Sequence, residues 1–169
     1  SHIKGLLFNL FHTLWPTLFN CNGFLLGMLT PIVKAKKGKK IVQFYSLKDY
    51  ESWKTKNEIK GWDIKYYKGL GTSTPSEAKE YFKDLKIVEY ISNNENDIKS
   101  IELAFSKEKD SSNKRKDWLL KYNDENTLDY TKKQVNFQEF IDYDFIHFSN
   151  SDNIRSIPNL LDGLKPSQR

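Results

Sequence analysis

The sequence has one cysteine, one methionine and no long apolar run. Cys21 is the single cysteine among 169 residues, so no internal disulfide forms, which suits a reducing compartment. Because apolar residues follow it at 24–26, we expect Cys21 to be a small buried side chain rather than a nucleophile. No segment approaches the roughly 20 apolar residues that span a bilayer. Residues 1–19 are interrupted by Lys4, His12 and Pro16, and no signal peptide is predicted.

Metal ligands and nucleotide loops are also scarce. The three histidines, His2, His12 and His147, have no cysteine or carboxylate partner at ligand spacing, which argues against a zinc site. The Gly-Leu-Gly segment at 69–71 is not followed by a Gly-Lys-Ser/Thr motif, so it is not a nucleotide-binding loop.

The composition favours a folded and basic protein. Apolar residues make up 38% and aromatic residues 14%, which is enough for a core because each buried aromatic ring removes a large area from water. Lysine and arginine number 27 against 22 acidic residues, a net charge of +5. Such a balance favours a polyanionic partner, although excess lysine also serves solubility, and charge alone leaves both interpretations open.

The N-terminal half alternates helix and strand patterns. Apolar residues at three- and four-residue steps predict a helix with one broad apolar face over 3–14, ending at Trp15-Pro16. Residues 24–34 and 41–45 are predicted strands of a hairpin whose basic turn covers 34–40.

Ser46 is a predicted helix cap, followed by a strand at 62–67, a loop at 68–75, a helix at 75–85 and a strand at 87–91. This order indicates an α/β fold with a partly parallel sheet.

The composition becomes more polar after residue 92. Polar stretches at 93–97 and 107–116 enclose a predicted short helix, another helix is predicted at 113–122, and 123–133 is a predicted loop. We expect boundaries near 95 and 145.

Three segments are distinctive enough to suggest a family. They are SHIKGLL at 1–7, YYKGLGTS at 66–73 and SNSDNIRSIPNLLDGLKPSQR at 149–169. In this order and spacing they resemble eukaryotic-type DNA topoisomerase II, a type IIA topoisomerase, and the resemblance covers nearly the whole chain.

The resemblance implies a location within that enzyme. It implies that 1–95 is the C-terminal part of a TOPRIM domain with a Rossmann-type partial sheet, 96–145 a helical linker, and 146–169 the start of a winged-helix domain. The carboxylates that bind Mg²⁺ are implied to lie before Ser1 and the nucleophilic tyrosine downstream, so the chain contains no catalytic or metal-binding residue of its own.

The resemblance also implies partners and cofactors. The whole enzyme is expected to be a homodimer that acts on double-stranded DNA with Mg²⁺ and ATP, neither of which this chain's residues bind. The expected location is the nucleus, or the cytoplasm for a virus-encoded relative.

Candidate DNA contacts lie near the C-terminus. Arg155, Lys165 and Arg169 fall within fifteen residues, and Pro166 is a suitable first-turn residue of a helix whose free N–H groups attract anions. From the residues alone, an ordinary solvated helix start is the alternative. The resemblance favours the phosphate site, because matching positions lie beside the cleaved strand.

Further candidates come from two other segments. The basic run 114–116 is usually a solvated helix face, but the resemblance implies that Arg115 and Lys116 contact the DNA backbone. Lys68 is either a DNA contact or part of a structural ion pair. The alternative function is a non-catalytic basic module that binds DNA or a protein and shares the fold.

Overall fold

The chain folds into two compact units, which are described separately. The computed structural model describes residues 1–67, 69–157, 164 and 166–168. The helical unit contains Ser1–Leu25, Tyr90–Leu128 and Gln134–Arg169, and the sheet unit contains Leu26–Glu89 and Asp129–Lys133.

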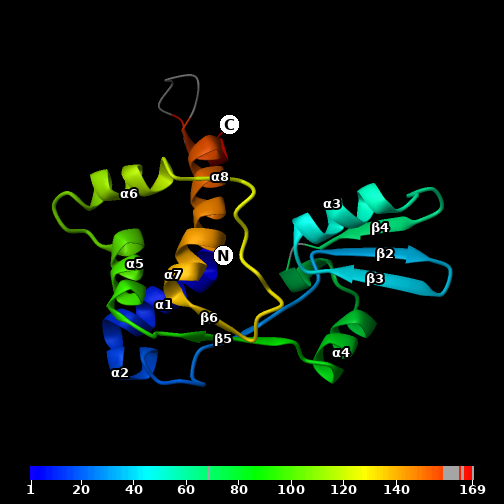
Figure 1. Cartoon of the computed structure of the whole chain (residues 1–169), viewed down its shortest axis with the longest axis horizontal. Coiled ribbons are helices and arrows are strands. Elements are labelled where there is room, and N and C mark those ends of the chain that lie inside the picture. The colour runs from blue at the N-terminus through cyan, green and yellow to red at the C-terminus, as the bar shows by residue number, and fades with distance from the viewer. Residues whose placement is uncertain (68, 158–163, 165, 169) are drawn as a thin grey trace. The chain divides into compact units, whose positions relative to one another are not determined.

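Helices form most of the helical unit (Figure 1). Its elements are α1 (His2–Leu14), α2 (Pro16–Phe19), α5 (Glu95–Phe105), α6 (Ser111–Leu119), β6 (Gln134–Asn136), α7 (Phe137–Phe140), the π-helical η2 (Ile141–Phe145), α8 (Ile146–Ser156) and the 3-10 turn η3 (Pro166–Gln168). The segments α7, η2 and α8 follow one another without a break, because the residues at both junctions keep right-handed helical torsions.

Aromatic rings make the core of the helical unit. Phe19 stacks on Phe137 with ring centroids 4.1 Å apart, and Phe8 meets Phe137 and Phe140 edge-on at 5.2 and 5.0 Å. Gly5 lets α1 approach this core, since a Cβ added there would lie 2.8 Å from the ring of Phe145.

The apolar face predicted for α1 does not point into this core. The helix buries Gly5 and Phe8, whereas its large aliphatic residues are exposed; they are Ile3, Leu6, Leu7, Leu10 and Leu14. A helix that is apolar on both sides is typical of a helix covered on both sides. The helix predicted over 3–14 is therefore confirmed, and the residues of its predicted apolar face are mostly exposed within this chain.

The sheet unit contains short strands and two helices. Its elements are β1 (Leu26–Met28), β2 (Val33–Lys37), β3 (Lys40–Phe44), α3 (Leu47–Lys56), β4 (Asp63–Tyr66), the 3-10 turn η1 (Gly69–Thr72), α4 (Pro75–Lys83) and β5 (Ile87–Ile91), which passes into the helical unit at Tyr90. One sheet has the order β3-β2-β4, and the other has the order β1-β5-β6.

The α/β class is confirmed, but the sheet direction differs from the prediction. The pairs β1–β5, β2–β3 and β2–β4 are all antiparallel, so the expectation of a partly parallel sheet is wrong for these strands. The helix α3 does not return the chain to a parallel neighbour; it is followed by β4, which pairs with the free side of β2.

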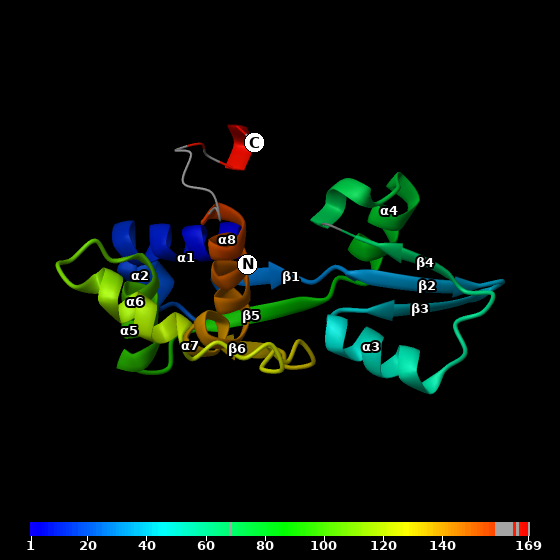
Figure 2. The ribbon, with the colours of Figure 1, turned by 90° about the horizontal axis from the view of Figure 1, so that it is seen from above.

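Side chains alternate between the two faces of the sheet along β2 and β3, and this alternation explains the core of the sheet unit. Val33 and Ala35 are buried and stand opposite Phe44 and Val42, so these four side chains share one face. Tyr50 of α3 covers that face together with Trp53 and Trp62. Figure 2 shows α3 and α4 on opposite sides of this sheet.

Local signals in the sequence predict the starts of α1, α3 and α4 to within one residue, whereas the continuous helical segment from α7 to α8 is not among the predicted helices. The Ser46 hydroxyl accepts a hydrogen bond from the amide of Asp49, as predicted for a cap. The predicted hairpin is confirmed, but its strands extend through most of the basic run and leave only Gly38 and Lys39 as the turn. The first predicted strand, 24–34, is wrong as a single element, because its 26–28 part is β1, which pairs with β5 in the other sheet. Cys21 is exposed, so the expectation that it is buried is wrong.

A buried carboxylate joins two helix starts of the helical unit. Asp97 is fully buried and is the third residue of α5, where its Oδ2 accepts hydrogen bonds from the amides of Asn93 at 2.8 Å and Asn94 at 3.2 Å. Its Oδ1 accepts a third bond, at 3.0 Å, from the amide of Gln138 in α7. The carboxylate therefore fixes α7 against α5.

Asp97→Asn is expected to reduce the free energy of unfolding by about 2–3 kcal/mol, because hydrogen bonds to a charged group contribute more than neutral ones and the amide nitrogen cannot accept. Urea unfolding monitored by circular dichroism measures this. The control is Glu95→Gln on the same helix. Its exposed carboxylate forms a surface ion pair with Lys99, so the substitution should change stability by less than about 0.5 kcal/mol. Equal effects of the two substitutions would contradict the role given to Asp97.

Candidate nucleic-acid interface

The positive charge of the chain is concentrated in the sheet unit. That unit has 16 lysines and 9 acidic residues, a net charge of +7, whereas the helical unit has 11 basic and 13 acidic residues, a net charge of −2. The two values together give the +5 of the whole chain. A polyanion is therefore attracted to the sheet unit as a whole and to the helical unit only at local basic clusters.

One local cluster lies on α6, which is held in place at its C-terminal end. The indole Nε1 of Trp118 donates a 3.0 Å hydrogen bond to Asp142 of η2, and the Trp118 ring stacks near Phe145. Arg115 is half-buried and its Nη1 donates to the carbonyl of Ser106 at 2.9 Å. Lys116 is exposed. Of the two residues predicted here, Lys116 presents its charge to solvent and Arg115 uses one nitrogen to hold the preceding loop.

The third described candidate, Arg155, lies in the last turn of α8. Its exposed guanidinium forms an ion pair with Asp152 one turn earlier. Contact with a phosphate would require this surface ion pair to open, which costs little because exposed pairs contribute only about 0–1 kcal/mol.

Three predicted residues lie outside the described part of the chain: Lys68, Lys165 and Arg169. The predicted helix start at Pro166 is represented by η3, a single 3-10 turn of three residues. The predicted cluster of Arg155, Lys165 and Arg169 therefore stays a prediction.

The Gly-Leu-Gly segment of the 66–73 motif lies between two residues that bind the same carboxylate. The hydroxyl of Tyr67, before the loop, donates a short hydrogen bond to Glu77 Oε1. After the loop, the amide of Thr74 donates to Glu77 Oε2 at 2.8 Å, and the hydroxyl of Thr74 caps α4 by accepting from the Glu77 amide. Glu77 thus fixes the chain on both sides of the Gly-Leu-Gly segment.

Two lysines of the sheet complete this cluster. Lys65 of β4 lies 3.2 Å from Glu77 Oε2, and buried Lys34 of β2 lies 3.6 Å from Oε1. Lys34 also lies 4.6 Å from the centre of the Tyr81 ring.

Electrostatics stabilise the ionised form of Glu77. Burial by itself raises the pKa of Glu77, but the hydrogen bonds from Thr74, Tyr67 and Lys65 and the charge of Lys34 outweigh it and lower the pKa to about 2. Burial and the bond to Glu77 raise the pKa of Tyr67, so Tyr67 stays a donor.

Glu77 is not among the site residues predicted from the sequence, although a signal for it is present. Thr74 and Glu77 are spaced as a capping box, in which the third helical residue returns a bond to the cap. The sequence gives no signal for the other contacts of Glu77, which come from Tyr67 and from the two lysines of neighbouring strands.

The histidines have ordinary packing roles. His2 stacks on Phe148 with centroids 4.4 Å apart, His12 lies 3.8 Å from Glu102, and His147 is hydrogen-bonded to the carbonyl of Asn126. Across the described residues, no group of three or more histidine, cysteine, aspartate or glutamate side chains is placed to hold a metal ion. No helix in the same part of the chain is long and apolar enough to cross a bilayer.

Glu77→Gln tests the cluster through its pH dependence. A carboxyl whose pKa is lower in the folded state stabilises the fold above its unfolded pKa, near 4.5, and loses that contribution as the pH falls through about 2. At pH 7 we expect Glu77→Gln to be about 2–3 kcal/mol less stable than the wild type, and the difference should shrink between pH 4.5 and 2.

Thermal or urea unfolding across this pH range measures the difference. The control is Glu80→Gln, which removes a more exposed carboxylate 3.7 Å from the same Lys34 and should have a small effect. A Glu77→Gln difference that stays constant down to pH 2 would contradict the electrostatic account.

Comparisons with known proteins agree on one family. Residues 28–153 match a family model described as the C-terminal associated domain of TOPRIM, a range that crosses both boundaries predicted from the sequence, near 95 and 145. The whole chain is 50% identical to DNA topoisomerase 2 of Arabidopsis thaliana, 43% identical to that of Plasmodium falciparum and 45% identical to a putative mitochondrial DNA topoisomerase 2 of Caenorhabditis elegans. It spans 12%, 12% and 14% of these relatives.

A solved structure is similar over almost the whole chain. The crystal structure of the DNA-binding, cleavage and re-ligation domain of Plasmodium falciparum topoisomerase II superposes with a TM-score of 0.86 at 42% sequence identity. The similarity covers 98% of this chain and 23% of that one. The chain therefore belongs to the family of C-terminal domains associated with TOPRIM, and over its full length it is similar to a segment of DNA topoisomerase 2.

Proposed function

We propose that this chain forms part of the DNA cleavage and religation core of an ATP-dependent type II DNA topoisomerase. Within that core it contacts the phosphate backbone of a duplex, while the metal-binding carboxylates and the nucleophilic tyrosine belong to other segments of a longer protein. The observation that carries the proposal is the TM-score of 0.86 over 98% of the chain to a domain named for DNA binding, cleavage and re-ligation.

The reaction of the whole enzyme follows from this assignment. A tyrosine oxygen attacks a DNA phosphate and forms a phosphotyrosine bond as the deoxyribose oxygen leaves, and the reverse reaction reseals the strand. Two subunits of a homodimer do this on opposite strands, and a second duplex passes through the break. Mg²⁺, when bound, supplies positive charge at the cleaved phosphate. ATP is bound by another segment.

Side chains of this chain act by holding the DNA in place. Arg115 and Lys116 of α6 and Arg155 of α8 contact backbone phosphates, and Lys68, Lys165 and Arg169 are further contacts in segments outside the described residues. Positive charge that is fixed before the reaction is more effective than mobile charge, because it does not have to reorganise at the transition state. Anchoring of α6 through Trp118 and Asp142 supports this role for Lys116.

The exposed side of α1 supports the view that the chain works within a larger protein. Its apolar residues Ile3, Leu6 and Leu7 are 73%, 46% and 46% exposed, and contiguous apolar surface of this kind is typical of an interface. A eukaryotic topoisomerase 2 acts in the nucleus, which is the location we propose, although one of the relatives is named as mitochondrial.

Lys116→Gln tests the proposed contact with the DNA backbone. We expect the wild-type chain to bind a short duplex with an affinity that falls steeply with salt, and the substitution to make the log–log salt slope less steep by roughly 0.9, the value for one neutralised phosphate. Fluorescence anisotropy with a labelled duplex measures both slopes.

The matched control is Lys99→Gln on the neighbouring helix α5, whose ammonium is held 3.2 Å from Glu95. It should leave the slope unchanged. Binding of the wild type that does not depend on salt, or equal changes for the two variants, would count against the proposal.

A further inference from the structure

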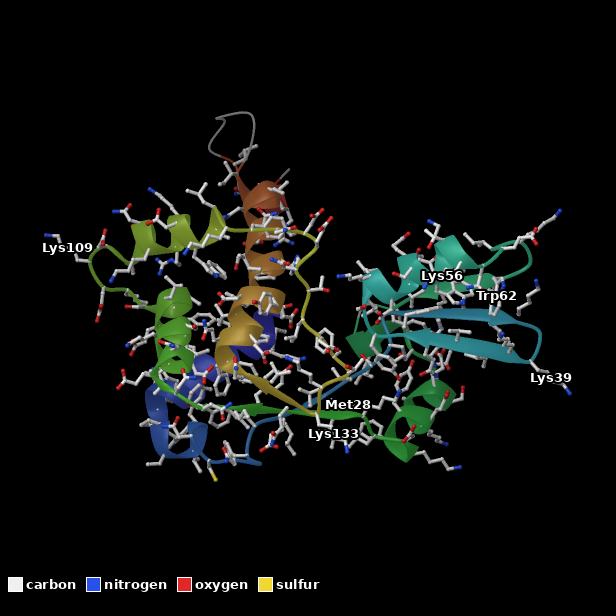
Figure 3. All side chains as sticks on the ribbon, viewed as in Figure 1. Met28, Lys39, Lys56, Trp62, Lys109 and Lys133 are labelled. Carbon is white, nitrogen blue, oxygen red and sulfur yellow. The ribbon has the colours of Figure 1, made fainter. Side chains whose placement is uncertain are left out.

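Exposed lysines are concentrated at the turn end of the β2–β3 hairpin. Four lysines, Lys36, Lys37, Lys39 and Lys40, are exposed around the two-residue turn. Figure 3 shows Lys39 at the outermost point of this hairpin, directed away from the sheet.

Lysines at the base of the same sheet are neutralised, whereas those at the tip are not. Lys34 and Lys65 form ion pairs with Glu77 of α4. Within the described part of the chain, no ion pair with a carboxylate is formed by Lys37, Lys39 or Lys40. The tip therefore keeps its full positive charge.

The strand register adds to this concentration of charge. Lys37 and Lys40 stand directly opposite each other in the antiparallel pair, an arrangement of like charges that destabilises a hairpin. Their ammonium groups lie 6.0 and 5.9 Å from the centre of the same indole ring, that of Trp62, and Lys37 also donates to the carbonyl of Lys60. Both ammonium groups are thus held near the same ring, that of Trp62, although their like charges repel each other.

Protection of a sheet edge explains only part of this pattern. The order β3-β2-β4 makes β3 an edge strand, where lysine discourages aggregation, and this accounts for Lys40. It does not account for Lys37, which lies on the central strand β2. Like charges placed directly opposite each other break a local rule of strand pairing, and natural sequences break such rules mainly at functional sites.

We propose that the tip of the β2–β3 hairpin, formed by Lys37, Lys39 and Lys40 over Trp62, is an additional binding surface for the phosphate backbone of duplex DNA. This choice of polyanion rests on the proposed function. The unit that carries the hairpin has a net charge of +7, which is complementary to a duplex. The surface contributes affinity rather than chemistry, because exposed lysines at a turn are screened by salt and are not aimed at one phosphate.

The test removes three charges from the tip and keeps its packing. In Lys37→Met/Lys39→Gln/Lys40→Met, the methionines retain unbranched stems beside Trp62. We expect duplex affinity at low salt to fall at least about tenfold and the log–log salt slope to become less steep by roughly 2–3, about 0.9 for each phosphate that the variant no longer neutralises. The melting temperature should stay the same or rise, since the cross-strand repulsion is gone.

The matched control, Lys79→Gln/Lys83→Gln/Lys86→Gln, removes three exposed lysines of the same unit on and just after α4. It should lower affinity by less than about threefold. If the tip variant binds like the wild type, or if the affinity of the control falls as far, the inference is overturned and the proposed function is not. A tip variant that aggregates while its DNA affinity is unchanged assigns the lysines to edge protection alone and also overturns it. Failure of the wild-type chain to bind any duplex overturns both.

Discussion

The carboxylate of Asp97 is the contact on which the helical unit depends. It joins the start of α5 to the start of α7, although Asp97 and Gln138 are 41 residues apart. Because α7 continues into η2 and α8, this one anchor also sets where Asp142 meets Trp118 of α6. The positions proposed for DNA contact, Lys116 and Arg155, therefore depend on a charge that is itself fully buried.

In the sheet unit, a helix-capping carboxylate plays the same role at the Gly-Leu-Gly segment. Glu77, like Asp97, is the third residue of a capped helix whose carboxylate also reaches beyond its own helix. It fixes both ends of the Gly-Leu-Gly loop and, together with Glu80 beside Lys34, neutralises Lys34 and Lys65 at the base of the sheet. As a result, the uncompensated charge of this sheet lies at the hairpin tip. In the sheet unit, the half-buried Glu77 thus determines which lysines are held for structure and which remain available to a polyanion.

Local signals in the sequence were sufficient for the starts of α1, α3 and α4, the hairpin and the family. Ser46 and the periodic residues of α1 could be interpreted without tertiary information, because caps and periodicity act within a few residues. Three features depended on distant parts of the chain. The antiparallel placement of β4 beside β2, the direction of the apolar face of α1 and the exposure of Cys21 are all set by which segments are available to pack against. Likewise, the sequence identified Lys116 and Arg155 as candidates but did not reveal that Arg155 is paired with Asp152.

We propose that these residues bind DNA but do not cut it by themselves. A gel assay with supercoiled plasmid, the purified chain, Mg²⁺ and ATP at low salt tests this most directly, since one experiment records both retardation and topology. We expect the plasmid to be retarded by the chain and, after the protein is removed, to run at its original supercoiled position. Reproducible relaxation, or nicked plasmid carrying covalently attached protein, would contradict it by placing the nucleophile within these 169 residues.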